Sequence, residues 1–181
     1  MFGSAVKWKR RSQDRLARLA LAIDAIAEHD RRLVEEGALV DDLHREGAAA
    51  LYRICRSFVD DLNGRLVEPA VILDPSEWNP DGYDAGSSNL FQISLRGRLL
   101  QIEFTATEEP YSTEDFRQRY VLSGGVRSFN QNFLEKDTVD EQQIFFCPGA
   151  VGAAWHFFDA RTYRSGLLTV DYLAAELERL L

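Results

Sequence analysis

Residues 141–159, EQQIFFCPGAVGAAWHFFD, predict two antiparallel strands joined by a turn, and they decide the class of the fold. Glu141–Cys147 and Ala153–Asp159 are rich in aromatic side chains, and the segment between them contains a proline and two glycines. Apolar runs of this length around a Pro/Gly turn are typical of a β-hairpin. The hairpin places an antiparallel sheet at the centre of the prediction.

Neither strand of this hairpin alternates cleanly between apolar and polar side chains. With a five-residue turn, alternation predicts one face with Phe145, Trp155 and Phe157 and another with Ile144, Phe146 and Phe158. Strand pairs that are apolar on both sides normally have both faces covered. If all helices of the chain pack on one face, the other must contact a second sheet, a ligand or another subunit.

The first third of the chain has helical periodicity. A heptad series, which we call the apolar seam, runs through Leu16, Leu19, Ile23, Ile26 and Leu33, with Asp30 at one core position. Gly37 predicts the end of this helix, and a second helix is predicted over Asp41–Asn63. The short connection predicts an antiparallel helical hairpin over residues 1–64. The seam fits a short coiled coil between copies or an amphipathic helix packed on its own domain.

Residues 65–181 predict an antiparallel sheet of about six or seven strands and a C-terminal helix that begins after Thr169. The expected strands are Leu66–Leu73, residues 91–95 and 100–106, Phe116–Leu122 and Val126–Leu134 around a turn at residues 123–125, and the pair in 141–159. Runs of strands flanked by helices indicate an α+β fold. We therefore expect a single α+β domain over residues 1–181.

The charge of the chain is acidic and unevenly distributed. Twenty-one Lys and Arg against 29 Asp and Glu give a net charge of −8, yet residues 1–18 hold six bases and one acid. An acidic body argues against nucleic acid as a partner. The basic start fits a solvated helix end, an arm that contacts an acidic surface of a neighbouring copy, or contact with a membrane surface. No apolar run is long enough to span a membrane.

Motifs for catalysis or for cofactor binding are absent from the sequence. The two cysteines, Cys55 and Cys147, form no CxxC pair, which favours a reducing, cytoplasmic location. His29 and His44 are expected on solvated helix faces, so we expect no metal site. A five-residue turn would place Cys147 and His156 on opposite sheet faces, and a four-residue turn would place them on one face but about 13 Å apart, so either argues against a catalytic dyad. We expect no cofactor and, on balance, no enzyme.

The segment Asp74–Asn89, DPSEWNPDGYDAGSSN, predicts a long loop. Loops of this length within compact domains are often functional. If a small-molecule pocket lies under it, its contacts are expected to be Trp78, Asp81, Tyr83 and Asp84.

Two functions remain from the sequence. The first is a non-enzymatic association module that binds itself as a homodimer through the apolar seam and binds another protein. The alternative is a small-molecule-binding domain or enzyme with its pocket under the 74–89 loop.

Overall fold

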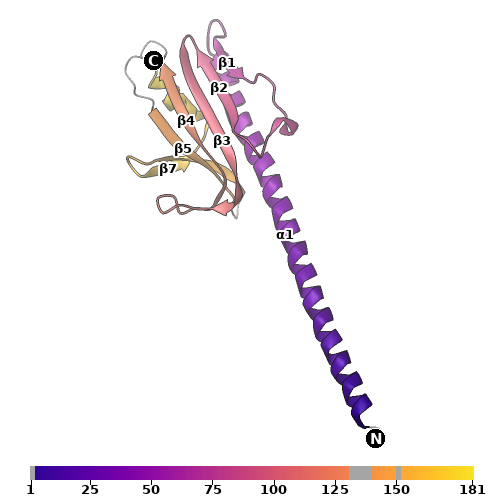
Figure 1. The fold of residues 1–181 in the computed structure, drawn as a ribbon. Helices are drawn as coiled ribbons and strands as arrows, with labels where there is room; N and C mark the ends of the chain where they lie inside the picture. Colours follow the sequence, from indigo (N-terminus) through magenta and orange to yellow (C-terminus); the bar gives the residue numbers. More distant parts are fainter. Residues whose placement is uncertain (1–2, 131–139, 150–151) are drawn as a thin grey trace. The chain divides into compact units, whose positions relative to one another are not determined.

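The structure is a computed structural model that describes residues 3–130, 140–149 and 152–181, with side chains for 15–32, 35–129, 141–149 and 152–181. The chain divides into two compact units, Met1–Leu39 and Val40–Leu181, which we call the N-terminal unit and the sheet unit. Helix α1, Gly3–Asn63, contributes residues to both units (Figure 1). Each unit is described by itself below.

The helical hairpin predicted for residues 1–64 is wrong, because α1 continues through Gly37 without a turn. An internal glycine costs a helix only about 1 kcal/mol relative to alanine. Gly37 is flanked by the good helix formers Glu36 and Ala38, and no proline or turn residue reinforces the stop. The predicted end at Gly64 is confirmed, where the Gly64 amide donates to the Asp60 carbonyl oxygen at 2.9 Å.

The sheet unit contains seven antiparallel strands in simple sequential order, followed by helix α2, Val170–Glu178, so the predicted α+β class is confirmed (Figure 1). The strands are β1 Val71–Asp74, β2 Asn89–Leu95, β3 Arg98–Tyr111, β4 Tyr120–Asn130, β5 Asp140–Cys147, β6 Ala154–Asp159 and β7 Arg164–Leu167. The predicted turn between β2 and β3 and the predicted N-cap at Thr169 are both present. Sequence analysis missed β7.

The turn predicted at residues 123–125 is wrong, because β4 passes straight through both glycines. Gly124 pairs with Phe104 of β3, and a Cβ on Gly124 would overlap the carbonyl oxygen of Glu103. A Cβ on Gly125 would lie 2.7 Å from a carboxylate oxygen of Glu141. The glycines therefore allow close approach of the neighbouring strands instead of a reversal. Residues 131–134 of the predicted second strand lie outside the described part of the chain.

The two faces of the β5–β6 hairpin also differ from the prediction. Cys147 pairs with Ala154, one residue later than expected, so Trp155 lies opposite Phe146 and Phe157 opposite Ile144. A one-residue change of register moves every side chain of a strand to the other face. Trp155 and Phe157 consequently share a face with Ile144 and Phe146, and Phe158 shares the opposite face with Phe145.

One face of the sheet, which we call the helix face, is covered by the Val40–Asn63 part of α1 and by α2. Side chains of both helices and of six strands form one continuous core that includes Leu51, Phe91, Phe146, Trp155 and Leu173. The indole N–H of Trp155 donates to the carbonyl oxygen of Gly47 at 2.7 Å. A Cβ on Gly47 would lie 2.5 Å from Leu122, so the glycine permits this close helix–sheet contact. We call the other side the open face.

The edge strand β1 is shorter than predicted and is fixed to α1 by one side chain. The side-chain oxygen Oδ1 of Asn63 accepts from the backbone amides of Ala70 and Val71, both at 3.0 Å. Its side-chain Nδ2 donates to the backbone carbonyl oxygen of Val71 at 2.8 Å. β1 is the outermost strand of the sheet, a position compatible with the nearby Pro69, which has no backbone N–H to donate. These bonds start the strand that leads into the 74–89 loop.

Candidate functional site

The apolar seam lies on the surface of the N-terminal unit. Its side chains keep more than half of their surface exposed: Leu16 62%, Leu19 56%, Ile23 56% and Ile26 61%. All described side chains of this unit are exposed. The side chain of Leu33, the last member of the seam, lies outside the described residues. Helices in proteins gain most of their stability from packing an apolar face, so the seam is a candidate association surface.

The polar and apolar sides of this helix segment are separate. Glu28 accepts from Arg31 at 2.7 Å and from Arg32 at 3.4 Å, and all three charged side chains are about half exposed or more. Leu21 is exposed as well, but in the heptad it falls on the side opposite the seam. The unit therefore offers one continuous apolar stripe and a matched exposed leucine outside it.

The open face of the sheet unit carries a second apolar group, the aromatic cluster of Phe116, Tyr120, Phe145, Cys147 and Phe158. Phe116 stacks on Phe145 with ring centroids 4.4 Å apart, and Tyr120 lies 4.5 Å from Phe145 on the same measure. The Thr113 hydroxyl accepts from the Phe116 amide at 3.0 Å and holds the loop over the sheet. Every member of the aromatic cluster is buried, so the chain covers these rings with its own loop.

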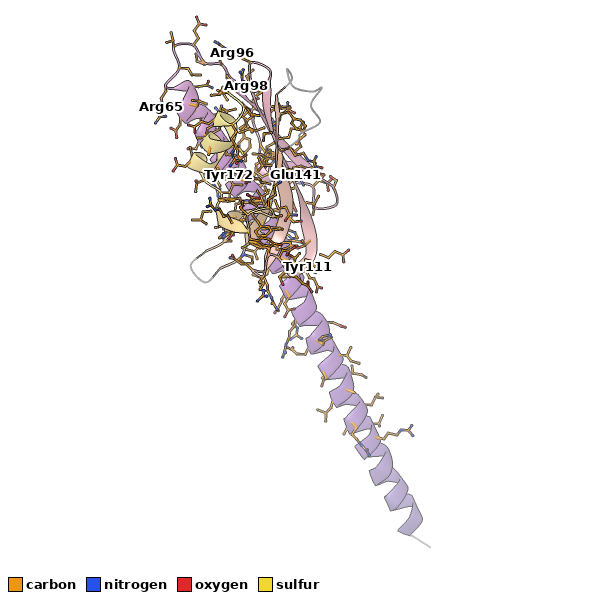
Figure 2. The ribbon with its side chains drawn as sticks, turned by 90° about the vertical axis from the view of Figure 1, so that its left-hand side faces the viewer. Arg65, Arg96, Arg98, Tyr111, Glu141 and Tyr172 are labelled. Atoms are coloured by element: carbon orange, nitrogen blue, oxygen red, sulfur yellow. The ribbon has the colours of Figure 1, made fainter. Side chains whose placement is uncertain are left out.

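Next to the aromatic cluster, the open face becomes polar. Arg127 donates to Glu103 at 3.0 Å and to Glu141 at 3.2 Å, and the Ser88 hydroxyl donates to Glu103 at 2.6 Å. These groups line a hollow of about 480 Å³ above Gly125. Figure 2 labels Glu141 on this face and Tyr172 of α2 on the helix side. Since one arginine is shared by two carboxylates and Asp115 also lines the hollow, the described residues around it carry a net negative charge and offer no free cationic group to an anionic ligand.

The four residues predicted from the 74–89 loop occupy different environments. Trp78 and Tyr83 are half-buried and pack against the main core, Trp78 between the rings of Tyr52 and Phe91 at 5.6 and 5.7 Å. Asp81 and Asp84 are exposed. Asp84 accepts from the Gly86 amide and the Ser87 hydroxyl, and these bonds lower the pKa of its carboxyl. The aromatic rings thus anchor the loop, and the two carboxylates face solvent.

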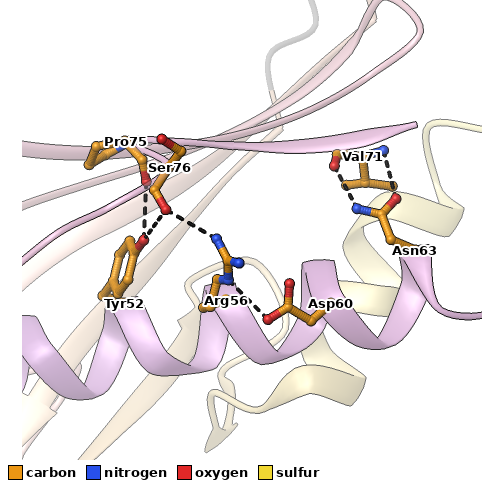
Figure 3. Close-up of polar contacts among 7 residues, drawn as sticks. All are labelled: Tyr52, Arg56, Asp60, Asn63, Val71, Pro75 and Ser76. Atoms are coloured by element: carbon orange, nitrogen blue, oxygen red, sulfur yellow. Dashed lines mark hydrogen bonds and ion pairs between the residues drawn. The ribbon is translucent and has the colours of Figure 1, made fainter. Parts of the chain in front are cut away.

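The start of this loop is bonded to α1 (Figure 3). The Tyr52 hydroxyl donates to the carbonyl oxygen of Ser76 at 2.8 Å, and Arg56 donates to the same oxygen at 3.1 Å while its Nε pairs with Asp60 at 2.9 Å. A hollow of about 710 Å³ is lined by Tyr52, Arg56 and residues 76–79. Tyr52, Arg56 and Asn79 are engaged in holding the loop, whereas the Glu77 side chain is exposed.

A further groove of about 750 Å³, which sequence analysis missed, lies at the end of the helix face. It is lined mainly by apolar side chains of α1, α2 and the segment after α1, among them Phe58, Leu62 and Leu177, with Arg96 and Arg98 at its rim. The Nε of Arg98 donates to the Leu180 carbonyl oxygen at 2.8 Å (Figure 2 labels both arginines). Its residues come from three separate segments, 58–70, 95–98 and 174–181, so no local pattern indicates the groove.

His44 is buried, and the expectation of a solvated position was wrong. Neither ring nitrogen has a hydrogen-bond partner, and the buried hydroxyl of the neighbouring Tyr83 also lacks one. Burial lowers the pKa of His44, an effect that Asp41 partly opposes, and burial raises the pKa of Tyr83 to about 12. The signal in the sequence was helical spacing, since His44 precedes the buried Ala48 and Leu51 by four and seven residues.

Cys147 and His156 lie on the same face of the sheet, in contrast to the prediction from a five-residue turn. His156 pairs with Phe145, which makes it a diagonal neighbour of Cys147. Burial raises the pKa of the Cys147 thiol to about 12 and lowers the pKa of His156. A thiol with that pKa is not a thiolate at neutral pH, so this arrangement supplies no activated nucleophile.

Among the described residues, no group of three His, Cys, Asp or Glu side chains is arranged to hold a metal ion. Within the same residues, the search for a helix with the length and apolarity of a membrane span found none. Comparisons of the chain with protein-family models, with curated proteins and with solved structures found no match. Support for the function of this protein therefore comes from the geometry of its two units.

Proposed function

We propose that the protein is a non-enzymatic association module that forms a homodimer through the apolar seam of its N-terminal unit and presents the sheet unit to another protein. The observation that carries this proposal is the exposure of Leu16, Leu19, Ile23 and Ile26 along one helix stripe. Complete burial of one such side chain contributes about 1.5–3 kcal/mol. A partner helix that covers the stripe would remove all four side chains from water.

The sheet unit supports assigning the dimer contact to the N-terminal unit. Its aromatic cluster is already covered by the loop that carries Phe116, and its core is covered by the helices. The sheet unit also exposes apolar side chains, among them Ile72 (63%) on β1, Leu167 (56%) on β7 and Leu181 (74%) after α2, but these lie on separate elements, whereas the seam gathers four on one helix stripe.

Sedimentation velocity of the full chain tests the proposal. We expect a dimer at about 10 μM, in the range where interfaces of modest size associate. Leu19→Asp or Ile26→Asp should shift the equilibrium at least tenfold toward monomer, because a buried carboxylate without a partner is strongly unfavourable. The matched control is Leu21→Asp, which changes a leucine outside the seam that is 69% exposed, against 56% for Leu19, and should leave the dimer intact. A strictly monomeric parent chain would contradict the proposal.

A cytoplasmic location is part of the proposal. Both cysteines are buried and unpaired in the sheet unit, which supports a reducing compartment. Fractionation of cells that express the full chain tests this location. Recovery in the membrane or extracellular fraction would contradict it.

Small-molecule binding beside the 74–89 loop is the second candidate function. It is supported by the hollow of about 710 Å³ next to the half-buried ring of Trp78. A thermal-shift screen of metabolites against the parent chain and Glu77→Ala tests it, because Glu77 lines the hollow with an exposed side chain and takes no part in the bonds that hold the loop. A ligand that stabilises the parent but not the variant would support this function over association alone.

A further inference from the structure

We infer that the occupant of the apolar seam is a second copy of the same helix segment that runs in the antiparallel direction. This inference rests on the proposed function, because it specifies the geometry of the dimer. It follows from three features of the N-terminal unit: the length of the seam, the position of Asp30 within it, and the charge of the residues on either side.

The apolar positions define how two antiparallel copies align. The four exposed members of the seam are centred on residue 21, with Leu19 and Ile23 inside and Leu16 and Ile26 outside. An antiparallel copy aligned on that centre places Leu19 beside Ile23 of the second copy and Leu16 beside Ile26. All four apolar layers are then filled by leucine–isoleucine pairs.

The charges of the segment favour this direction. In the antiparallel alignment, residues 7–18 of one copy lie beside residues 24–35 of the other. Residues 7–18 hold six bases and one acid, a net charge of +5, whereas residues 24–35 hold four acids and two bases, a net charge of −2. Opposite charges therefore meet at both ends of the contact. A parallel alignment would instead place +5 against +5 and −2 against −2.

Asp30 distinguishes the two directions at a single position. In a parallel pair, identical heptad core positions face each other, so two Asp30 carboxylates would meet within the seam. In the antiparallel pair, Asp30 lies beyond the four layers formed by Leu16, Leu19, Ile23 and Ile26 and faces the basic stretch of the second copy. Glu28 is occupied by Arg31 and Arg32 of its own helix, whereas no such pair is found for Asp30 among the described side chains.

Distance measurement between spin labels tests the direction. Glu35→Cys introduces an exposed thiol opposite the seam, and the native cysteines, buried with thiol pKa values of about 12, should take up little label. In the antiparallel dimer, the two labels are separated by 28 residues along the axis, or about 42 Å at 1.5 Å per residue. In a parallel dimer, the two labels lie at the same height along the axis, so the distance between them is set by the spacing across the helix pair and is below about 25 Å.

Leu21→Cys is the matched control, because residue 21 lies at the centre of the alignment and on the same side of the helix as residue 35. Its labels should be closer than about 25 Å in either direction. Short distances at both positions would overturn the antiparallel arrangement and leave the homodimer in place. A monomeric mass with no dipolar signal at either position would overturn the proposed function itself.

Salt provides a second readout on the unlabelled chain. Attraction between complementary ends is screened by salt, since the Debye length falls from about 10 Å at 0.1 M to about 3 Å at 1 M. We expect the dimer Kd to increase severalfold over this range. A Kd that decreases with salt would indicate repulsion between like charges and would contradict the antiparallel direction.

Discussion

The apolar seam of the N-terminal unit and the β5–β6 hairpin, which contributes Phe145, Cys147 and Phe158 to the aromatic cluster, raise the same question in sequence, since each has an apolar face with no evident cover. In the structure, the seam residues are more than half exposed, whereas every member of the aromatic cluster is buried. The difference arises from Phe116 and Tyr120, which come from the end of the β3–β4 connection and pack on Phe145. An apolar stripe thus indicates an interface only when no other segment of the same chain covers it.

The contrast between the buried aromatic cluster and the exposed seam is tested most strongly by removing the ring at the centre of the cluster. Phe145→Ala should lower the free energy of unfolding by about 3–5 kcal/mol, the usual range for a buried phenylalanine. Urea unfolding followed by circular dichroism measures this change. Leu21→Ala is the control and should stay within about 0.5 kcal/mol of the parent, because its side chain is exposed. If both variants lowered the free energy of unfolding by the same small amount, the aromatic cluster would contribute no more to stability than the exposed helix surface does.

Removing the cover should convert the aromatic cluster into a second exposed stripe. Phe116→Ala should cost about 2–3 kcal/mol, less than Phe145→Ala, because the loop that carries it is able to collapse into part of the space. The exposed rings should also bind a hydrophobic dye such as ANS. Unchanged dye binding and stability would show that Phe116 is not the cover of this face.

Buried His44 and half-buried His156 make the sheet unit sensitive to acid. Burial keeps the folded-state pKa of His44 and His156 below the 6.5 of the unfolded chain. As the pH falls below 6.5, the unfolded chain binds protons that the folded chain does not, so the free energy of unfolding should decrease. His44→Leu should reduce this slope, whereas His29→Gln, an exposed position of the N-terminal unit, should retain it. Urea midpoints between pH 7.5 and 5 measure the effect, and a stability that rises on acidification would contradict it.

The smallest effect is expected in the polar part of the open face. Arg127 is 38% exposed at its side chain, and its two carboxylate partners are 40% and 48% exposed. Partly solvated ion pairs contribute about 0–1 kcal/mol, so Arg127→Gln should lower the free energy of unfolding by less than about 1 kcal/mol. A loss comparable with that of Phe145→Ala would show that these ion pairs, and not the aromatic cluster, hold the open face.

Sequence reasoning recovered the elements of the fold better than it recovered their partners. The β2–β3 and β5–β6 hairpins and the capped helix after Thr169 follow from local periodicity and turn residues, and all three are present. Gly37 and Gly124 were misread as a stop and a turn. A glycine marks a break, a reversal or a close approach of another strand, and local sequence does not distinguish these roles.

The candidate sites likewise divide into those that local sequence predicts and those that depend on contacts between distant segments. Heptad spacing alone located the seam, because a helix stripe is a local property of the chain. The positions of Trp78 and Tyr83 against the core, the burial of His44 and the groove near Arg98 depend on segments distant in sequence. No local pattern encodes such contacts.

The amino-acid sequence by itself determined the α+β class, the β2–β3 and β5–β6 hairpins, the uneven charge and the heptad stripe, because each depends on neighbours within a few residues. Only the tertiary structure decided which sheet face the helices cover and which apolar stripe keeps its exposure. A single residue of register, Cys147 opposite Ala154, and a single loop over Phe145 set those outcomes. Both are contacts between distant segments, whose free energy depends on the whole packed sheet.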